Sequence, residues 1–222
     1  MAVVGLLVAA GSGERLGAGA PKAFVPCAGR PLFEWSLDVL SEVCDRVMIA
    51  VPPGLDGEGS DRVVGHAARS GSVRAALAAA PEAELAVVHD AARPLVTAAL
   101  VERCLAALAG GWDGAVAAAR ATDTLKETGR EDGAVVRTLP RERMWVVQTP
   151  QVFRAEALRR ALDVDDAALA RASDDAALVE AAGGTVRVVE APADNLKVTT
   201  ALDLRIAETV LRERGEGGER PC

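Results

Sequence analysis

Aromatic side chains and histidines are scarce in this chain. Its 222 residues include three Phe, three Trp and no Tyr, although half of all residues are hydrophobic. A core for a chain of this size must therefore be filled mainly by Ala, Val and Leu. Only two histidines are present, His66 and His89. That shortage argues against a metal centre built on a histidine cluster.

Clustered cysteines, long apolar runs and excess positive charge are also missing. The four cysteines are scattered without metal-ligand spacing, so we expect buried, reduced thiols in a cytoplasmic protein. No apolar run approaches the ~20 residues of a membrane helix, and we expect no signal peptide because the start lacks a basic leader. A net charge of −7 argues against a general binder of nucleic acids or acidic membranes.

Glycine, by contrast, is concentrated in one stretch near the N-terminus. The stretch combines an apolar run, three glycines and two basic residues: 3–8, Gly11, Gly13, Gly17, Arg15 and Lys22. The pattern predicts a buried parallel strand followed by a loop. Glycines let backbone N–H groups approach a ligand closely, and the two cations suit a phosphate chain. The structural alternative is an ordinary strand-to-helix turn with two solvated charges.

Two better-known glycine motifs do not match this stretch. A Walker A loop requires Gly-Lys-Ser/Thr after its second glycine, and the chain has no such run. A dinucleotide fingerprint requires Gly-x-Gly-x-x-Gly opening a helix, whereas three residues separate Gly13 from Gly17 and Pro21 follows soon after. The loop therefore stays open, which favours a long, highly charged ligand over a dinucleotide docked on a helix end.

Further along, short apolar runs alternate with segments of helical periodicity. The runs are 46–51, 85–88, 114–119, 145–151 and 186–189, and the helical segments are 31–40, 97–108, 155–162, a short one after Asp175, and 201–212. Alternation of this kind predicts one α/β domain over residues 1–222, with a mostly parallel sheet and helices on both faces. Ser72 is a plausible N-cap for another helix running to Ala80.

Two segments depart from the alternating pattern. Residues 120–143 are too polar for core, and two strand-like stretches, 122–130 and 133–139, surround a Gly/Asp turn. They predict an arm that projects from the domain. Residues 215–222 are rich in glycine and charge, and we expect a disordered tail there.

Asp90 is the strongest candidate for a functional carboxylate. It follows a predicted strand, in the run His89-Asp90-Ala91-Ala92-Arg93-Pro94. Ligands of such sheets bind at the carboxyl ends of the strands, where the glycine loop also lies. A carboxylate there suits a sugar hydroxyl or a phosphate-bound Mg²⁺. The alternative is that Asp90 caps the next turn and pairs with Arg93.

The glycine loop resembles the opening of the sugar-nucleotidyltransferases, and further motifs narrow the resemblance. They are Asp123-Thr124-x-Lys126, Trp145 with Gln148-Thr149-Pro150-Gln151, Ser173-Asp174-Asp175-Ala176 and Asn195-x-Lys197-Val198-Thr199. Together and in this order they resemble the 2-C-methyl-D-erythritol 4-phosphate cytidylyltransferase family of the non-mevalonate isoprenoid pathway. The resemblance runs from Val3 to about Leu204. It implies a Rossmann-like fold of the nucleotide-diphospho-sugar transferase type.

The resemblance also implies roles for individual residues. Residues placed around CTP are Ala9, Ala10, Gly11, Gly13, Ser72, Asp90 and Ala91. Arg15 and Lys22 would stabilise the transition state, and Arg141 and Lys197 would position the sugar phosphate. Thr124, Thr149 and Ser173 would help to hold that substrate. The implied cofactor is Mg²⁺, held mainly by CTP phosphates with Asp90 as a candidate ligand. The implied assembly is a homodimer whose arm reaches into the neighbouring site.

Two departures from the family pattern and two rival classes of function remain. The segment that reads cytosine usually has a Gly-Gly pair, and here Gly65-His66 stands in its place, while Ser173 replaces a common threonine. The nearest rival function is cytidylyl transfer to another polyol phosphate, such as ribitol 5-phosphate. The rivals from other classes are a dinucleotide-dependent oxidoreductase and a nucleotide sensor that binds CTP without turnover.

Overall fold

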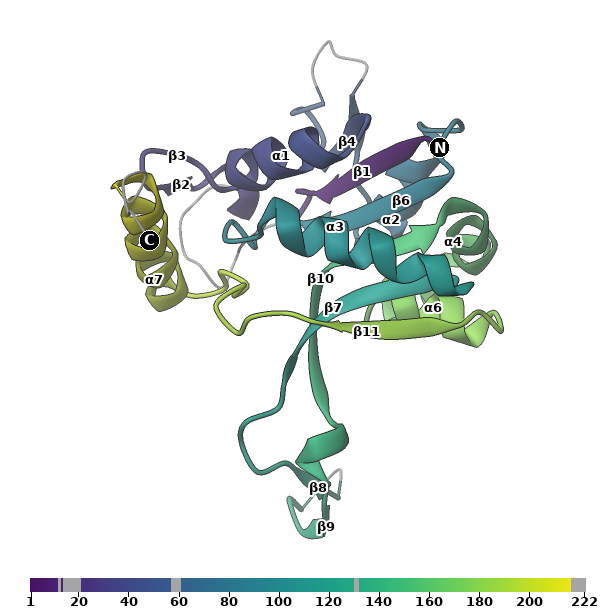
Figure 1. The fold of residues 1–222 in the computed structure, drawn as a ribbon, viewed down its shortest axis with the longest axis vertical. Helices are drawn as coiled ribbons and strands as arrows, with labels where there is room; N and C mark the ends of the chain where they lie inside the picture. The colour runs from purple at the N-terminus through teal and green to yellow at the C-terminus, as the bar shows by residue number, and fades with distance from the viewer. Residues whose placement is uncertain (12, 14–20, 57–60, 130–131, 217–222) are drawn as a thin grey trace.

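A seven-stranded sheet forms the centre of the molecule in the computed structural model, which describes residues 1–11, 13, 21–56, 61–129 and 132–216 (Figure 1). In spatial order its strands are β11 (Val186–Glu190), β7 (Gly114–Arg120), β10 (Trp145–Arg154), β6 (Leu85–Asp90), β1 (Val3–Val8), β4 (Arg46–Val51) and β5 (Arg62–Val64). Only β10 runs antiparallel to its neighbours in this sheet, so the predicted mostly parallel sheet is confirmed.

Helices cover both faces of the sheet, as the alternating pattern predicted. On one face lie α1 (Leu32–Val43) and α3 (Ala98–Ala107), and on the other lie α2 (Arg69–Ala78), α4 (Ala155–Leu162), α5 (Asp166–Arg171) and α6 (Asp175–Ala181). Strand β6 shows why both layers form: Leu85 and Val87 belong to the first hydrophobic cluster, and Ala86 and Val88 belong to the second. Side chains of a strand alternate between faces, so one buried strand supplies both cores.

The structure corrects the predicted start of α2 and adds elements that the sequence patterns missed. Ser72 is not an N-cap: α2 begins at Arg69 behind Ala68, and Ser72 lies inside it. Helix α5 and strand β5 were not predicted, because each is too short to show a clear period in the sequence. A second small pair, β2 (Pro26–Cys27) with β3 (Arg30–Pro31), was also missed.

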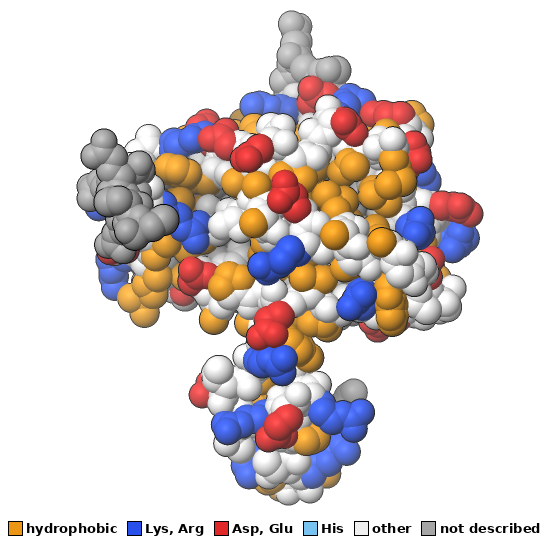
Figure 2. Space-filling model, viewed as in Figure 1, with side chains coloured by type: hydrophobic (Ala, Val, Ile, Leu, Met, Phe, Trp, Pro, Cys, Tyr) orange, Lys and Arg blue, Asp and Glu red, His pale blue; other side chains and the backbone are white. Residues whose placement is uncertain are grey.

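The arm is formed by the segment between β7 and β10. It contains β8 (Lys126–Thr128), β9 (Val135–Thr138) and the 3₁₀ turn η4 (Arg141–Arg143), and β8 pairs antiparallel with β9. Figure 1 shows it projecting from the sheet, and Figure 2 shows it as a separate lobe with Lys and Arg side chains over much of its visible surface. The Val135 and Val136 side chains are exposed in this chain.

The final helix, α7 (Ala201–Glu216), packs against one end of the molecule. A third hydrophobic cluster joins Ala207 and Leu211 of this helix to Leu95 and Val198. The helix includes the first two residues of the predicted tail, and residues 217–222 lie outside the described part of the chain. Across the described residues, no helix is long and apolar enough to span a membrane.

Candidate active site

A cavity of about 630 Å³ opens at the carboxyl edge of the sheet. Four segments that are distant in sequence form its walls: the end of β1 with the glycine loop, the segment from His66 to Ser72, the end of β6, and the loop before α7. Nine predicted site residues line it: Ala9, Ala10, Gly11, Gly13, Lys22, Ser72, Asp90, Ala91 and Lys197. The sequence therefore located this cavity, because strand ends and glycine content are visible without knowledge of the fold.

The glycine loop closes on itself at Lys22. Gly13 has a φ of +76°, and a Cβ added there would lie 2.7 Å from the Cβ of Lys22. The Lys22 N–H donates to the Gly11 carbonyl at 3.3 Å, so the chain returns to the point from which the loop departs. Only glycine satisfies both the backbone angle and this contact. Arg15, the other predicted cation of the loop, lies outside the described residues.

Asp90 lies between two cations. Its Oδ1 accepts from Nε of Arg69 at 2.7 Å, and its Oδ2 accepts from Nζ of Lys197 at 2.6 Å. Burial would raise the pKa of the Asp90 carboxyl, but Arg69 and Lys197 outweigh it and hold that pKa well below its usual range. Arg93 is not the hydrogen-bonding partner of this carboxylate: its Nη1 donates to the Asn195 carbonyl. The carboxylate therefore pairs with Arg69 and Lys197, and the hydrogen bond with Arg93 is the one from the Arg93 N–H to the Asp90 carbonyl.

His89 and Thr149 are buried, hydrogen-bonded to each other and linked to the backbone of Asp90. Nε2 of His89 faces the Arg93 carbonyl at 3.2 Å and therefore carries the ring proton, because a carbonyl only accepts. The other ring nitrogen, Nδ1, then accepts from Oγ1 of Thr149 at 3.0 Å, and that hydroxyl accepts from the Asp90 N–H. Thr149, predicted to hold substrate, is buried with its hydroxyl fully engaged. It does not line the cavity, and its hydroxyl bonds the backbone of Asp90.

Ser72 has a similar internal task. Its Oγ accepts from the His66 N–H at 2.9 Å and lies 3.2 Å from the His66 carbonyl. The hydroxyl therefore folds the segment that precedes α2. The His66 ring, which replaces the usual glycine, lies against Gly71: a Cβ added to Gly71 would lie 2.5 Å from Nδ1 of the ring. His66 lines the cavity, so an imidazole ring forms part of the cavity wall in this chain.

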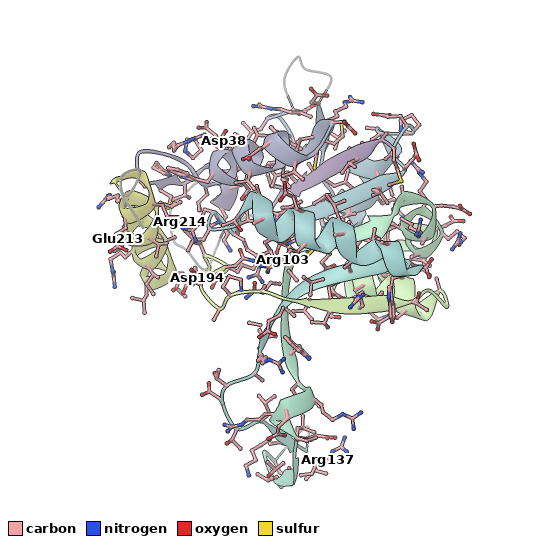
Figure 3. All side chains as sticks on the ribbon, viewed as in Figure 1. Asp38, Arg103, Arg137, Asp194, Glu213 and Arg214 are labelled. Carbon is pink, nitrogen blue, oxygen red and sulfur yellow. The ribbon has the colours of Figure 1, made fainter. Side chains whose placement is uncertain are left out.

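Helix α7 fixes the loop that carries Lys197. Asp203 in its first turn accepts from the N–H groups of Thr199 and Thr200 and from the Thr199 hydroxyl. These hydrogen bonds, the Thr199 hydroxyl first, lower the pKa of the Asp203 carboxyl to about 2. Arg214 near the other end of the helix forms an ion pair with Asp194 at 3.7 Å. Both residues are labelled in Figure 3. The loop is thus tied to both ends of α7.

Besides Thr149, three predicted residues do not line this cavity within one chain. Thr124 and Arg141 are exposed on the arm, where Nη1 of Arg141 donates to the Thr122 carbonyl. Ser173 is exposed just before α6. The structure also adds residues that the sequence reading did not assign. Arg69 and Thr199 line the cavity, and Asp175, fully buried, contacts Arg69 from behind.

Metal and thiol chemistry are restricted in the described part of the chain. It holds no group of three or more His, Cys, Asp or Glu side chains that could bind a metal ion. The thiols of Cys27, Cys44 and Cys104 are buried, and burial raises their pKa values to about 11, 12 and 12, so they stay protonated and unreactive at neutral pH. The predicted buried thiols are confirmed for these three.

The buried imidazole generates a prediction about stability. Burial lowers the pKa of His89 from 6.5 to about 4. Between those two pH values the unfolded chain binds a proton that the folded chain does not, so stability increases with pH across that window. The span corresponds to about 3 kcal/mol. Urea titrations of the wild-type protein and His89→Gln at several pH values measure it. The variant should show a flatter pH dependence, and equal slopes would contradict the assignment.

The comparisons with known proteins agree on one family. The sequence profile of the 2-C-methyl-D-erythritol 4-phosphate cytidylyltransferase family matches residues 3–213. The protein of that name from Nocardia farcinica is 43% identical, with 96% of this chain and 95% of that protein covered. The Deinococcus radiodurans protein of the same name is 42% identical, with 92% and 88% covered.

A solved structure extends the agreement to the fold. The crystal structure of 2-C-methyl-D-erythritol 4-phosphate cytidylyltransferase from Thermus thermophilus superposes with a TM-score of 0.79 at 38% identity, covering 96% of this chain and all of that one. The α/β fold, the cavity at the sheet edge and the profile match over nearly the whole length lead to one conclusion. This chain belongs to the 2-C-methyl-D-erythritol 4-phosphate cytidylyltransferase family.

Proposed function

We propose that this chain, as a single nucleotidyltransferase domain, transfers CMP from CTP to 2-C-methyl-D-erythritol 4-phosphate. The products are 4-diphosphocytidyl-2-C-methyl-D-erythritol and pyrophosphate. The observation that carries the proposal is the cavity at the carboxyl edge of the sheet, where a glycine loop and two lysines, Lys22 and Lys197, face Asp90. Family membership assigns the reaction, and the cavity supplies the groups that the reaction needs.

The lining of the cavity gives the nucleotide a direction. Lys22 and the glycine loop form an end suited to the triphosphate, because backbone N–H groups and cations both attract phosphate oxygens. Ala10, His66 and Ser72 line a part of the cavity where small and polar side chains suit the nucleobase. Asp90 and Ala91 lie on the wall formed by the end of β6, where the ribose would meet the protein.

The reaction requires charge stabilisation more than proton transfer. The attacking group is a phosphate oxygen of the substrate, and a phosphate monoester is largely dianionic at pH 7 because its second pKa is about 6. No general base is therefore needed, and His89 could not act as one because its ring nitrogens are engaged in the interior. Lys22, Lys197 and Arg15 would offset the repulsion between anions as the nucleophile attacks the α-phosphorus in line.

Magnesium fits this site as an ion held chiefly by the substrate. Mg²⁺ is usually bound by one or two carboxylates together with substrate phosphates. The carboxylate that lines the cavity is Asp90, and both of its oxygens are paired with cations. Triphosphate oxygens would hold the ion, with Asp90 as its protein ligand. When bound, Mg²⁺ would neutralise charge on the triphosphate.

The proposal is tested by incubating the purified protein with CTP, Mg²⁺ and a panel of polyol phosphates while pyrophosphate release is followed. We expect release with 2-C-methyl-D-erythritol 4-phosphate and little with the other compounds. Faster release with ribitol 5-phosphate would reassign the acceptor. CTP binding without release would identify a sensor, and binding of a nicotinamide dinucleotide without release would identify an oxidoreductase.

Removal of Lys22 should slow the chemical step. Lys22 lines the cavity next to the glycine loop, so Lys22→Ala should lower kcat on the order of 10²-fold, as expected for a preorganised charge. Steady-state kinetics with both substrates measures the change. Arg160→Ala, on the exposed surface of α4, is the matched control and should leave kcat unchanged. A raised KM for CTP with normal kcat would reduce Lys22 to a tether.

The contact between His66 and Gly71 gives a test of the nucleobase end. Gly71→Ala places a methyl group where the His66 ring lies, so it should displace the ring and raise KM for CTP about 10-fold. In a His66→Gly background the same substitution should cost little, because the conflicting ring is gone. Kinetics of the two single variants and the double variant measure the coupling. Equal losses in both backgrounds would show that Gly71 acts independently of His66.

We also propose a homodimer whose arms complete the sites. Arg141 and Thr124 are exposed on the arm rather than in the cavity, and Val135 and Val136 of the arm and Val146 of β10 are exposed in an isolated chain. A lone hairpin is only marginally stable in water, and a partner surface would hold it and cover these side chains. Arg141 and Thr124 of one subunit would then reach the sugar phosphate bound by the other.

Mixing two inactive variants tests the shared site. Lys22→Ala and Arg141→Ala are combined under conditions that exchange subunits, with exchange confirmed independently. If Arg141 acts in the neighbouring site, each mixed dimer has one intact site, and an equal mixture should recover about a quarter of wild-type activity. If Arg141 acts in its own subunit, every site lacks one group, and activity should stay at the level of the parents.

A further inference from the structure

Behind the cavity, Asp175 continues the charge pairing that begins at Lys197. Arg69 is held on two sides: its Nε donates to Asp90, and its Nη1 donates to Oδ2 of Asp175. The series Lys197, Asp90, Arg69, Asp175 therefore alternates in sign and brings together residues from four distant parts of the chain. Its last member is fully buried and does not line the cavity.

Burial makes this carboxylate costly unless it has a specific partner. A buried ion pair often adds little net stability, because each charge loses its hydration. The other oxygen of Asp175, Oδ1, has no hydrogen-bond partner within the described residues. Burial would lower the pKa of the Arg69 guanidinium, but Asp90 and Asp175 outweigh it and raise that pKa, so Arg69 stays charged. The observed interaction of Asp175 is therefore directed at one atom of Arg69.

Capping of α6 does not explain Asp175. The residue before it, Asp174, is the N-cap of that helix, and its Oδ1 accepts from the Ala177 N–H at 3.0 Å. The other oxygen of Asp174 accepts from Gln151 at 2.7 Å. The two adjacent aspartates thus have separate partners: Asp174 holds the helix, and Asp175 holds Arg69.

We propose that Asp175 is a positioning residue for cytidylyl transfer, which holds Arg69 so that Asp90 keeps one oxygen for Lys197. The inference rests on the proposed function. Without the charge of Asp175, the guanidinium of Arg69 is free to turn and grip both oxygens of Asp90, the geometry that arginine favours with a carboxylate. Oδ2 of Asp90 then no longer orients Lys197. The ammonium that meets the substrate phosphate loses its fixed position.

The substitution Asp175→Asn removes the charge and keeps the shape. We expect kcat/KM for the sugar phosphate to fall between 10-fold and 100-fold, since small misplacements of catalytic groups cost about 100-fold. The dissociation constant of CTP, measured by calorimetry, should change less than about threefold, because Lys22 and the glycine loop are untouched. Asp174→Asn is the matched control: asparagine caps helices as well as aspartate does, and its amide can donate to Oε1 of Gln151, which has no partner among the described residues, so activity should stay within about twofold.

A second variant shows whether the effect passes through Arg69. Arg69→Lys keeps the charge, but a single ammonium group cannot hold both carboxylates in the planar fork of arginine, so it should reproduce the loss. In the Arg69→Lys background, Asp175→Asn should lower kcat/KM no further. This variant also tests the inference if Asp175→Asn fails to fold. Additive losses, or equal losses in Asp174→Asn and Asp175→Asn, would overturn the proposal.

A spectroscopic readout separates this inference from the function itself. The chain has three lysines, so the ¹⁵N signals of their ammonium groups can be assigned by substitution. We expect the Lys197 signal to shift in Asp175→Asn and to stay unchanged in Asp174→Asn. An unchanged Lys197 signal in Asp175→Asn would overturn the positioning role whatever reaction the protein catalyses. An inactive wild-type protein with the expected shift would contradict the proposed function alone.

Discussion

A single buried carboxylate determines how the cavity is organised. Asp90 ends a strand whose side chains are all buried, and it pairs with Arg69 from α2 and Lys197 from the loop before α7. Because the chain is acidic overall, cations must be gathered locally before a triphosphate and a phosphate monoester can share one site. Asp90 achieves this by holding two of them. The position of Asp90 is itself fixed by hydrogen bonds that run from its backbone N–H to Thr149 and from Thr149 to His89.

Small residues let the segments that form the cavity wall pack closely against one another. Gly13 meets Lys22 where no side chain would fit, and a Cβ on Gly65 would lie 2.3 Å from the Cβ of Ala10. The scarcity of aromatic residues is consistent with this construction. Side chains of Ala, Val and Leu cover both faces of the sheet, so its strands stay close to the helices that support the cavity. Rigid support is what a site based on charge placement requires.

Much of the fold could be predicted because its signals are local. The apolar run of β4 and the amphipathic helix α4 were predicted with the bounds that the structure shows, since a buried run and a helical period are visible in short windows. Helix α2 was misjudged because Ser72 is a favoured cap residue, whereas the chain uses its hydroxyl to fold the preceding segment. Helix α5 was missed because its six residues are too few to show a helical period.

In the site, too, the residues that were predicted are those whose signals are local in the sequence. Residues on the glycine loop and at the end of β6 were predicted, because the ends of parallel strands meet at one edge. The link between Arg69 and Asp175 was not, since it joins positions 106 residues apart, and the motif Ser173-Asp174-Asp175-Ala176 does not reveal which residue Asp175 contacts. The role proposed for the arm is also not visible in a single chain. Exposed Arg141 gains a place in the proposed site only when a second subunit is considered.

The central claim is that the Asp90 carboxylate stays ionised because two cations hold it. Its most direct test is a ¹³C NMR titration of the aspartate carboxyl carbons in the protein without nucleotide, with Asp90 assigned by the Asp90→Asn variant. The account predicts that the Asp90 signal does not titrate around the usual aspartate pKa of about 3.9 as long as the protein stays folded. A titration at or above that value in the folded protein would contradict the claim.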